Sequence, residues 1–396
     1  MSFTKPSTAV KWAVSSMTGA PTLSGTAGSL IAVLDAFLVT GFGTKAVDSA
    51  QVTDGICRLS FTGTSAALEH TVITVSGITG DGAVLNGEQR VTAVASSYVE
   101  FACDLPDGPL TGTITFKMAP LGWEKVFSKT NVAVYRSTDI AGTRAYYRVD
   151  DTHELYARVQ MYESMTDVDT GVAAAPTTPA GGFYWRKRQS SGGTGVYWVL
   201  LGDSRAFYAL IASNDSTSAD TLNSYGTRSF FAGDINSYRS GDAWSAALMG
   251  SSSTSYGSLV SCFFSSSSSA GTVLQRQSHG IGGAVAFNRL VAGNVDSPSG
   301  RDATLGPFPS KVDNGLRLSP IILSDGEMAT AGPRGEAPGA YHCPQTGLIG
   351  AFGADVRLTD GRGPFAGHKL LTVGCGSLGG SATGCAVLDV TGPWRE

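Results

Sequence analysis

The fold is decided by residues Gly122 to Asp169, which read GWEKVFSKTNVAVYRSTDIAGTRAYYRVDDTHELYARVQMYESMTDVD. Charged and aromatic residues interleave here, although only 15% of the whole chain is Asp, Glu, Lys or Arg, against roughly a quarter in an average protein. Polar and apolar residues alternate with a period near two in 133–136, 144–149 and 156–162. The connections 137–143 and 150–153 contain the Asp and Gly that turns prefer. We therefore predict three antiparallel strands, with Arg and Tyr side chains facing water or a neighbouring subunit.

Composition indicates a mostly β, multi-domain protein. A length of 396 residues predicts about two or three domains, and 42% hydrophobic residues are enough to build real cores. Glycine, at 51 residues, is nearly double its usual share of roughly 7%, which favours short strands and tight turns over helices.

The charge balance gives no case for binding nucleic acid or an anionic membrane, because the formal net charge is −4. Trp185-Arg186-Lys187-Arg188 is the only tight basic cluster in the sequence, and we interpret it as a solvated strand end in preference to a phosphate contact. The first residues lack the apolar stretch of a signal peptide. The longest apolar run, 30–39, is far shorter than a membrane span and contains Asp35. We expect no nucleic-acid partner and no membrane insertion.

The cysteines indicate buried free thiols. The six are Cys57, Cys103, Cys262, Cys343, Cys375 and Cys385, and they form no CxxC pair that would suggest zinc or thioredoxin chemistry. Cys57 with Cys103, and Cys375 with Cys385, are expected on neighbouring strands. A chain made without a secretion signal keeps such thiols reduced.

Residues 1–44 are predicted to be an N-terminal arm and one helix of the main body. The first 25 residues are rich in Ser, Thr and Pro, so we expect them to lie extended as an arm for a neighbouring subunit. A helix follows, with Thr26 as its N-cap, apolar residues at helical spacing from Leu30, and Gly41 at its end.

Residues 45–117 are predicted to form an inserted, autonomous β-sandwich. Glycine-containing joints at 41–43 and 120–122 bracket the segment, as expected for a module inserted where chain ends lie close together. Its expected strands are 56–61, 70–75, 89–94, 98–102 and 111–116.

Residues 118–396 complete the β-rich main body. Its most buried strands are predicted at 183–185, 196–201 and 206–212, which are strongly apolar and aromatic. A buried strand is also expected at 259–264 within a Ser-rich tract, and 333–342, with its repeated Pro and Gly, is expected to be an ordered loop.

The candidate catalytic motifs in the sequence do not favour an enzyme. Gly202-Asp203-Ser204 matches the nucleophile block of GDSL-type esterases, and Asp150-Asp151-Thr152-His153 contains a D-x-x-H. In those esterases the Ser block comes first, whereas here it comes second, and it sits in a predicted hairpin turn. We therefore interpret Gly202-Asp203-Ser204 as a turn.

The sequence also contains no pattern that favours a metal-binding site. The five histidines, His70, His153, His279, His342 and His368, are widely spaced, and Asp167 and Asp169 fit turn capping better than a calcium loop. We predict no catalytic, cofactor-binding or metal-binding residues.

Two groups of residues resemble phage proteins. One resemblance is to an Ig-like module of tailed-bacteriophage virion proteins, whose usual sequence pattern is I-S-G…L-N-G-x-x-x-V. It is carried by Val72 to Ile78 followed by Leu85 to Val94. The main body resembles a phage structural-protein family, in a likeness extending from the N-terminal helix to the terminal Thr391-Gly392-Pro393-Trp394-Arg395. It is carried by the motifs at 119–125, 135–139, 148–151 and 163–171.

The resemblance implies a non-enzymatic virion component of the tail or baseplate, with an inserted Ig-like module. Its partners would be other virion proteins, further copies of itself and a host surface receptor. A head or capsid decoration protein is the first alternative. A virion hydrolase of cell-surface polysaccharide or esters is the second, and it requires convergent carboxylates or a Ser-His pair.

Overall fold

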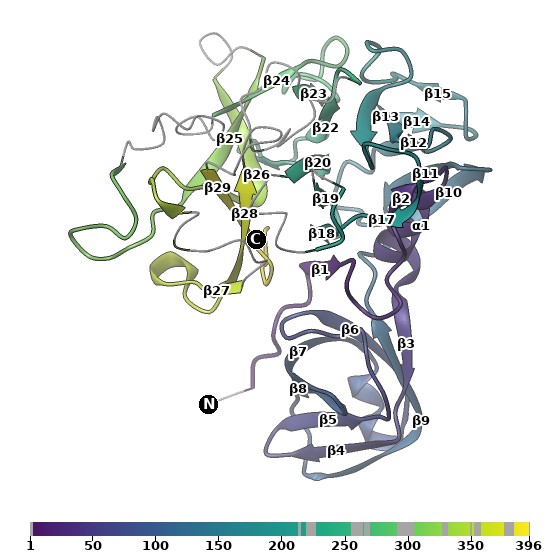
Figure 1. Cartoon of the computed structure of the whole chain (residues 1–396), viewed down its shortest axis with the longest axis vertical. Coiled ribbons are helices and arrows are strands. Elements are labelled where there is room, and N and C mark those ends of the chain that lie inside the picture. Colours follow the sequence, from purple (N-terminus) through teal and green to yellow (C-terminus); the bar gives the residue numbers. More distant parts are fainter. Residues whose placement is uncertain are drawn as a thin grey trace.

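The computed structural model describes residues 3–212, 215–218, 227–254, 264, 270–290, 305–326, 332–348, 351, 358–375 and 384–395. The chain is mostly β and multi-domain, which confirms the predicted fold class. Figure 1 shows a barrel of strands at one end of the molecule and the other two main sheets at the other end. The predicted strand at 259–264 lies outside the described residues except for Phe264, which is buried.

The largest sheet has eleven strands in the order β1-β18-β19-β20-β22-β16-β13-β12-β11-β10, with β23 paired to β22. The three predicted strands of the opening stretch are correct and antiparallel, because Tyr147 pairs with both Tyr135 and Met161. A fourth strand, β10, was not predicted because a bulge between Lys125 and Phe127 breaks its alternation. The bounds are β1 Lys11–Val14, β10 Trp123–Lys129, β11 Val132–Ser137, β12 Tyr146–Asp150, β13 Tyr156–Tyr162, β16 Phe183–Arg186, β18 Trp198–Gly202, β19 Ala206–Ala212, β20 Thr227–Asp234, β22 Ala246–Ser251 and β23 Ala270–Leu274.

This sheet curls into a half-barrel around an aromatic core. The rings of Trp123 on β10 and Phe207 on β19 meet at 5.4 Å, although their strands are far apart in the sheet order. Trp185 stacks on Phe230 at 5.3 Å inside the same core. On the opposite face of β19, Tyr208 packs against Trp394 at 5.8 Å. Both faces are therefore covered, which explains the continuous apolar sequence of β18 and β19 and confirms their predicted burial.

The second sheet has the order β24-β25-β26-β29-β28-β27, with β21 paired to β26. The prediction of a loop at 333–342 is wrong, because these residues are β26, a strand between β25 and β29. An irregularity between Pro320 and Ile322 of the partner strand accommodates Pro338, whose carbonyl accepts a hydrogen bond from Tyr208 at 2.9 Å. The bounds are β21 Asn236–Ser237, β24 Phe287–Leu290, β25 Ser319–Asp325, β26 Pro333–His342, β27 Leu358–Asp360, β28 Lys369–Cys375 and β29 Gly384–Asp389.

The inserted module forms two sheets that share β7 and β9. Pairing of β9 with β6 closes them into a six-stranded barrel. All five predicted strands are present, together with β3 and β4, which were not predicted. Chain entry and exit lie together, because Phe42 pairs with Met118. The bounds are β3 Phe42–Ala46, β4 Ser49–Thr53, β5 Ile56–Ser60, β6 Val72–Thr79, β7 Gly87–Ala95, β8 Tyr98–Ala102 and β9 Gly108–Met118, with a 3₁₀ turn η2 at Gly80–Leu85.

One barrel side chain joins the module to both ends of the chain. The guanidinium of Arg90, a residue that is only 5% exposed, donates to the carbonyls of Ser7, Val10, His70, Val390 and Thr391 at 2.7–3.1 Å. The hydrophobic core also continues from the barrel into the body. The joint is therefore packed and hydrogen-bonded.

The expectation that the first 25 residues form an extended arm for a neighbouring subunit is wrong for residues 10–25. β1 pairs with β18 and is buried along its length, and the two-residue strand β2 (Ser24–Gly25) pairs with β17 (Gly192–Gly195). Trp12 and Leu23 are 5% and 1% exposed. The segment is short of apolar residues, but those it has are placed in the body's own core.

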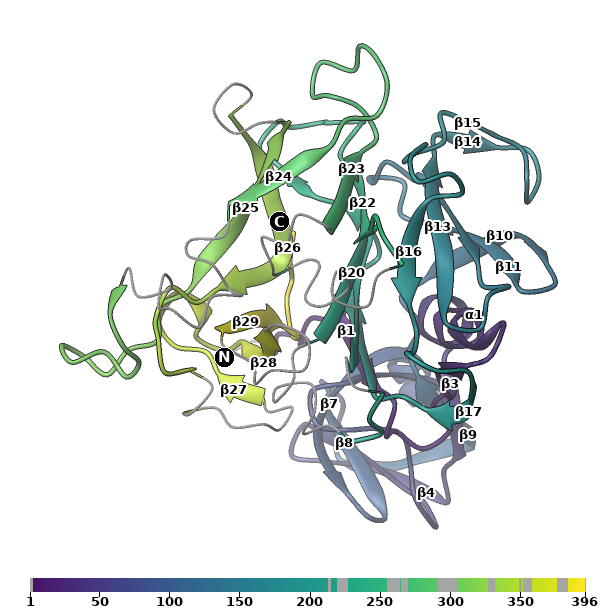
Figure 2. The same cartoon turned by 45° about the horizontal axis from the view of Figure 1, so that its top comes forward.

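The N-terminal helix consists of α1 (Ser29–Leu34) followed by a π-helical turn, η1 (Asp35–Thr40), and ends at Gly41 as predicted. Its N-cap is Gly28, which has no capping side chain, so the prediction of Thr26 is wrong. The orphan N–H groups of Leu30 and Ile31 instead bond the carboxylate of Asp151, at 2.8 and 3.3 Å. In Figure 2 this helix lies beside β10 and β11.

The described cysteines follow the prediction. Cys57 and Cys103 are buried free thiols, on β5 and directly after its neighbour β8. Burial and the neighbouring Cys103 raise the pKa of Cys57 to about 12. Cys343 is also buried. β28 and β29 are adjacent, with Cys375 opposite Gly384 and Cys385 opposite Gly374, and Cys262 lies outside the described residues.

Candidate functional site

Gly202-Asp203-Ser204 forms a turn between β18 and β19. Asp203 accepts from the backbone N–H groups of Arg205 and Ala206 at 2.8 Å each and pairs with Arg395 at 2.7 Å. The Ser204 hydroxyl donates to Asp139 at 2.8 Å. His153 is engaged separately, because its ring stacks on Tyr156 and its Nδ1 accepts from Leu155. These contacts agree with the turn interpretation and give Ser204 no histidine base.

The interpretation of the basic cluster at 185–188 as a solvated strand end is wrong for Lys187. Lys187 is fully buried, and its ammonium pairs with Asp151 at 2.5 Å and donates to the Thr26 carbonyl at 2.7 Å. Burial raises the pKa of Asp151 and lowers the pKa of Lys187. The sequence did not predict this ion pair, because Asp151 and Lys187 lie far apart along the chain.

Asp167 and Asp169 act as turn and ion-pair residues. Asp167 accepts from the backbone N–H groups of Asp169 and Thr170 at 2.8 and 2.9 Å, and Asp169 pairs with Lys129 and Arg148. In the described part of the chain, no group of three or more His, Cys, Asp or Glu residues is placed to hold a metal ion.

The outer face of the opening strands carries half-buried arginines stacked on tyrosines. Arg136 lies over Tyr146 at 4.7 Å and Arg158 over Tyr184 at 3.9 Å. Arg148 is tied to a hairpin of β14 (Ser164–Met165) and β15 (Gly171–Val172), which helps to cover this face. The predicted exposure of these side chains is therefore only partial.

A polar cleft of about 780 Å³, here called the loop cleft, lies between the turn after β11, the segment 234–245 and the chain end at 394–395. Its arginines are held in place: Arg205 pairs with Asp139 at 2.7 Å, and Arg395 pairs with Asp203 and donates to Asn236 at 2.8 Å. Such a network holds the cleft in one geometry.

Two carboxylates line the loop cleft, and both are engaged. Both oxygens of Asp234 accept from Thr143, at 2.5 and 2.8 Å, and burial raises the pKa of Asp234. Asp242 pairs with Arg334 at 3.0 Å, and both side chains are only 2% exposed. These contacts give both acids a structural role, whereas glycoside hydrolysis needs a carboxylate in contact with substrate.

Exposed apolar side chains border the loop cleft. Ile140 is 88% exposed beside the lining residue Ala141, and Tyr238 is 54% exposed between the lining residues Ser237 and Arg239. Ile281, 75% exposed, belongs to a neighbouring loop that Arg239 contacts through the Ser278 carbonyl. From the sequence, Ile140 was predicted only to lie in a turn. The one feature that could have indicated an exposed apolar side chain was the presence of an isoleucine in a connection that contains Asp and Gly.

The residues that carry the resemblance to the Ig-like module have structural roles in the barrel. The Asn86 side chain both accepts from the Ile78 N–H at 3.0 Å and donates to the Ile78 carbonyl at 2.8 Å, as a strand backbone would. Gly77 has a φ of +88°, and a Cβ there would lie 1.9 Å from the Thr113 carbonyl oxygen. These residues shape the β6 bulge.

No model of a known protein family matches this chain, and no curated protein is significantly similar to it in sequence. None of the helices in the described ranges combines the length and the apolar character that a membrane crossing needs.

Proposed function

We propose that this chain is a non-enzymatic structural subunit of a tailed-phage virion, with its place in the tail or baseplate. The body would bind neighbouring virion proteins or further copies of the chain, while the barrel projects and is available to a host surface receptor. The resemblance of the barrel and body motifs supplies the class of protein.

The observation that carries the contact role is the pair of exposed side chains, Ile140 and Tyr238, at the rim of the loop cleft. Protein interfaces combine aromatic or apolar anchors and arginine with a polar surround. The loop cleft offers this combination on a preformed surface, and the engaged state of Asp234 and Asp242 favours contact over hydrolysis.

Incorporation of variants into particles tests this proposal. Ile140→Asp puts a charge into the proposed contact, and Val84→Asp is the matched control because Val84 is 72% exposed on the barrel. In virions supplied only with the variant chain, we expect Ile140→Asp to reduce the copies per particle by about tenfold or more, since an interface anchor contributes about 2 kcal/mol, which is roughly thirtyfold in affinity. Val84→Asp should incorporate normally.

Equal incorporation of the two variants would contradict the contact surface. Absence of the wild-type chain from purified particles would contradict the virion role itself. Negative-stain images of intact particles labelled with an antibody against this chain would distinguish a tail or baseplate position from head decoration.

The hydrolase alternative has its own test. Purified wild-type protein should leave host surface polysaccharide and ester substrates intact. Degradation that is lost in Asp234→Asn or Ser204→Ala would replace the structural proposal with an enzymatic one.

A further inference from the structure

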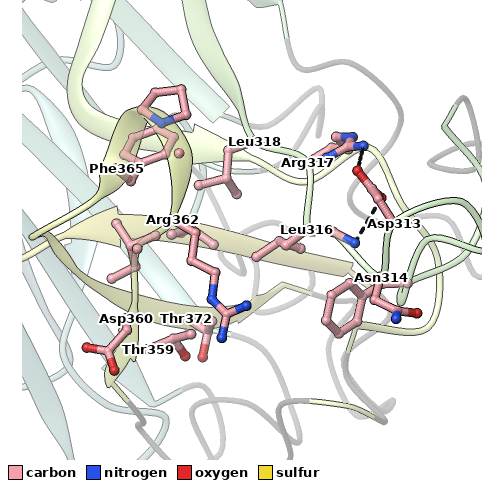
Figure 3. Close-up of a pocket in the computed structure, with 17 residues that line it drawn as sticks. Asp313, Asn314, Leu316, Arg317, Leu318, Thr359, Asp360, Arg362, Phe365 and Thr372 are labelled. Atoms are coloured by element: carbon pink, nitrogen blue, oxygen red, sulfur yellow. Dashed lines mark hydrogen bonds and ion pairs between the residues drawn. The ribbon is translucent and has the colours of Figure 1, made fainter.

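A second cavity, of about 790 Å³, lies on the C-terminal sheet (Figure 3) and shares no lining residue with the loop cleft. Strand register places Leu370, Thr372 and Val387 on one face of β28 and β29. Leu316 and Leu318 come from the segment before β25, and Phe365 comes from the 3₁₀ turn η5 (Gly363–Phe365). The floor is therefore apolar and is built from three separate parts of the chain.

Among the described residues, the charged groups at the rim leave one cation, Arg362, outside any ion pair, although Asp360 acts on it through space. Arg317 pairs with Asp313, and Asp360 pairs with Lys369. Arg362 makes no side-chain hydrogen bond or ion pair with the described residues, and Figure 3 shows its side chain reaching into the cavity. The cavity thus presents, above an apolar floor, one guanidinium that makes no ion pair with the described residues.

The wall of this cavity also contains a threonine whose buried hydroxyl has no partner among the described residues. Thr372 is 2% exposed, lines the cavity, and its Oγ1 has no hydrogen-bond partner among the described residues. Leaving such a group unpaired is unfavourable, so an occupant that accepts its hydrogen bond would be stabilised there.

We propose that this cavity binds a small amphiphilic carboxylate. Its apolar chain or ring would pack against Leu316, Leu370 and Phe365, and its carboxylate would accept from Arg362 and from the Thr372 hydroxyl. A multiply charged ligand fits less well, because Asp313 and Asp360 stand at the rim. A neutral apolar ligand would leave the guanidinium and the hydroxyl unmatched. This site goes beyond the proposed virion role.

Calorimetric titration of the full-length chain tests the proposal with three probes. Octanoate represents a free fatty acid, N-acetyl-leucine represents the carboxylate end of a polypeptide, and octanol offers a similar apolar chain without the charge. We expect at least one carboxylate to bind about tenfold or more tightly than octanol, since a charge-assisted hydrogen bond is worth that ratio or more. The stronger of the two carboxylates identifies the source of the ligand.

Two arginines form a matched pair of variants. Arg362→Gln should weaken binding of the preferred carboxylate about tenfold, whereas Arg317→Gln, which removes a cation already paired with Asp313, should change it less than about threefold. Thr372→Val should weaken binding and raise the melting temperature of the free chain, because it removes an unpaired buried hydroxyl. This stability increase shows that the variant is folded.

Three results would overturn the proposal. They are octanol binding as tightly as the carboxylates, equal losses in Arg362→Gln and Arg317→Gln, and no binding of either carboxylate at millimolar concentration.

Discussion

Asp151 and Lys187 form an ion pair of 2.5 Å in which neither side chain is exposed to solvent. The second oxygen of Asp151 accepts from the first turn of α1, and Lys187 donates to the Thr26 carbonyl. One pair therefore fixes the end of β12, the end of β16 and the start of the helix against each other. The pair fixes the positions of these elements and adds little net stability, because the free-energy cost of desolvating two charges is about as large as the gain from their attraction.

Removing one partner of this pair should be strongly destabilising. Lys187→Met leaves a buried carboxylate unpaired, and Asp151→Asn leaves a buried ammonium unpaired while keeping an oxygen for the helix N-terminus. We expect each to lower the unfolding free energy by about 3–5 kcal/mol in urea titrations. The double variant should lose clearly less than the sum of the two. Lys129→Met is the control, because Lys129 belongs to an exposed ion pair with Asp169, and it should lower the unfolding free energy by less than about 1 kcal/mol. If the losses of unfolding free energy in the Asp151 and Lys187 variants simply add, the two residues are not coupled.

Arg90 should control the stability of the joint between barrel and body. Arg90→Met removes the donor for five backbone carbonyls, two of them at the C-terminal end of the chain. We expect a loss of about 3 kcal/mol or more and faster proteolysis at the two ends. Arg58→Met is the control, because the Arg58 side chain is 52% exposed and pairs only at the barrel surface. If both variants cost the same, Arg90 does not clamp the joint.

The β6 bulge should tolerate no side chain. Gly77→Ala combines a φ of +88° with a Cβ 1.9 Å from a carbonyl oxygen, so the barrel must distort. Gly80→Ala also has a positive φ, of +66°, but a Cβ there meets nothing within 4 Å. We expect Gly80→Ala to cost about 1 kcal/mol and Gly77→Ala at least about 2 kcal/mol more, measured by thermal unfolding. Similar losses would show that the close contact relaxes freely.

Local patterns in the sequence predicted much of the fold and little of the candidate site. Strands such as β8 and β13 alternate regularly, and β19 is continuously apolar, so periodicity located them. β10 and β26 were missed because a bulge and repeated Pro and Gly override the pattern.

Long-range partners explain the remaining errors. The helix cap comes from Asp151, 121 residues from Leu30, and Lys187 is buried only because that carboxylate reaches it. The cavity near Arg362 joins segments around 316, 365, 372 and 387. No local sequence pattern predicts such long-range contacts, because each depends on how the sheets pack against one another.

The final prediction concerns acid stability and His342. This residue on β26 is 1% exposed, and both ring nitrogens lack a hydrogen-bond partner among the described residues. Burial lowers the pKa of His342 from 6.5 to about 4, so the folded chain holds the imidazole neutral. The unfolded chain binds the proton from pH 6.5 downward, and unfolding is therefore favoured progressively as the pH falls from 6.5 toward 4.

The unfolding free energy that His342 removes as the pH falls reaches its full value near the folded-state pKa, and it amounts to about 3 kcal/mol. His342→Phe keeps an aromatic ring and cannot titrate, so its unfolding free energy should fall less steeply over the same range. The measurement is urea unfolding of both proteins at several pH values between 7 and 4. His153→Phe is the matched control, because it makes the same substitution at a histidine that lies in an exposed turn. Parallel profiles for wild type and His342→Phe would show that His342 does not contribute to acid sensitivity.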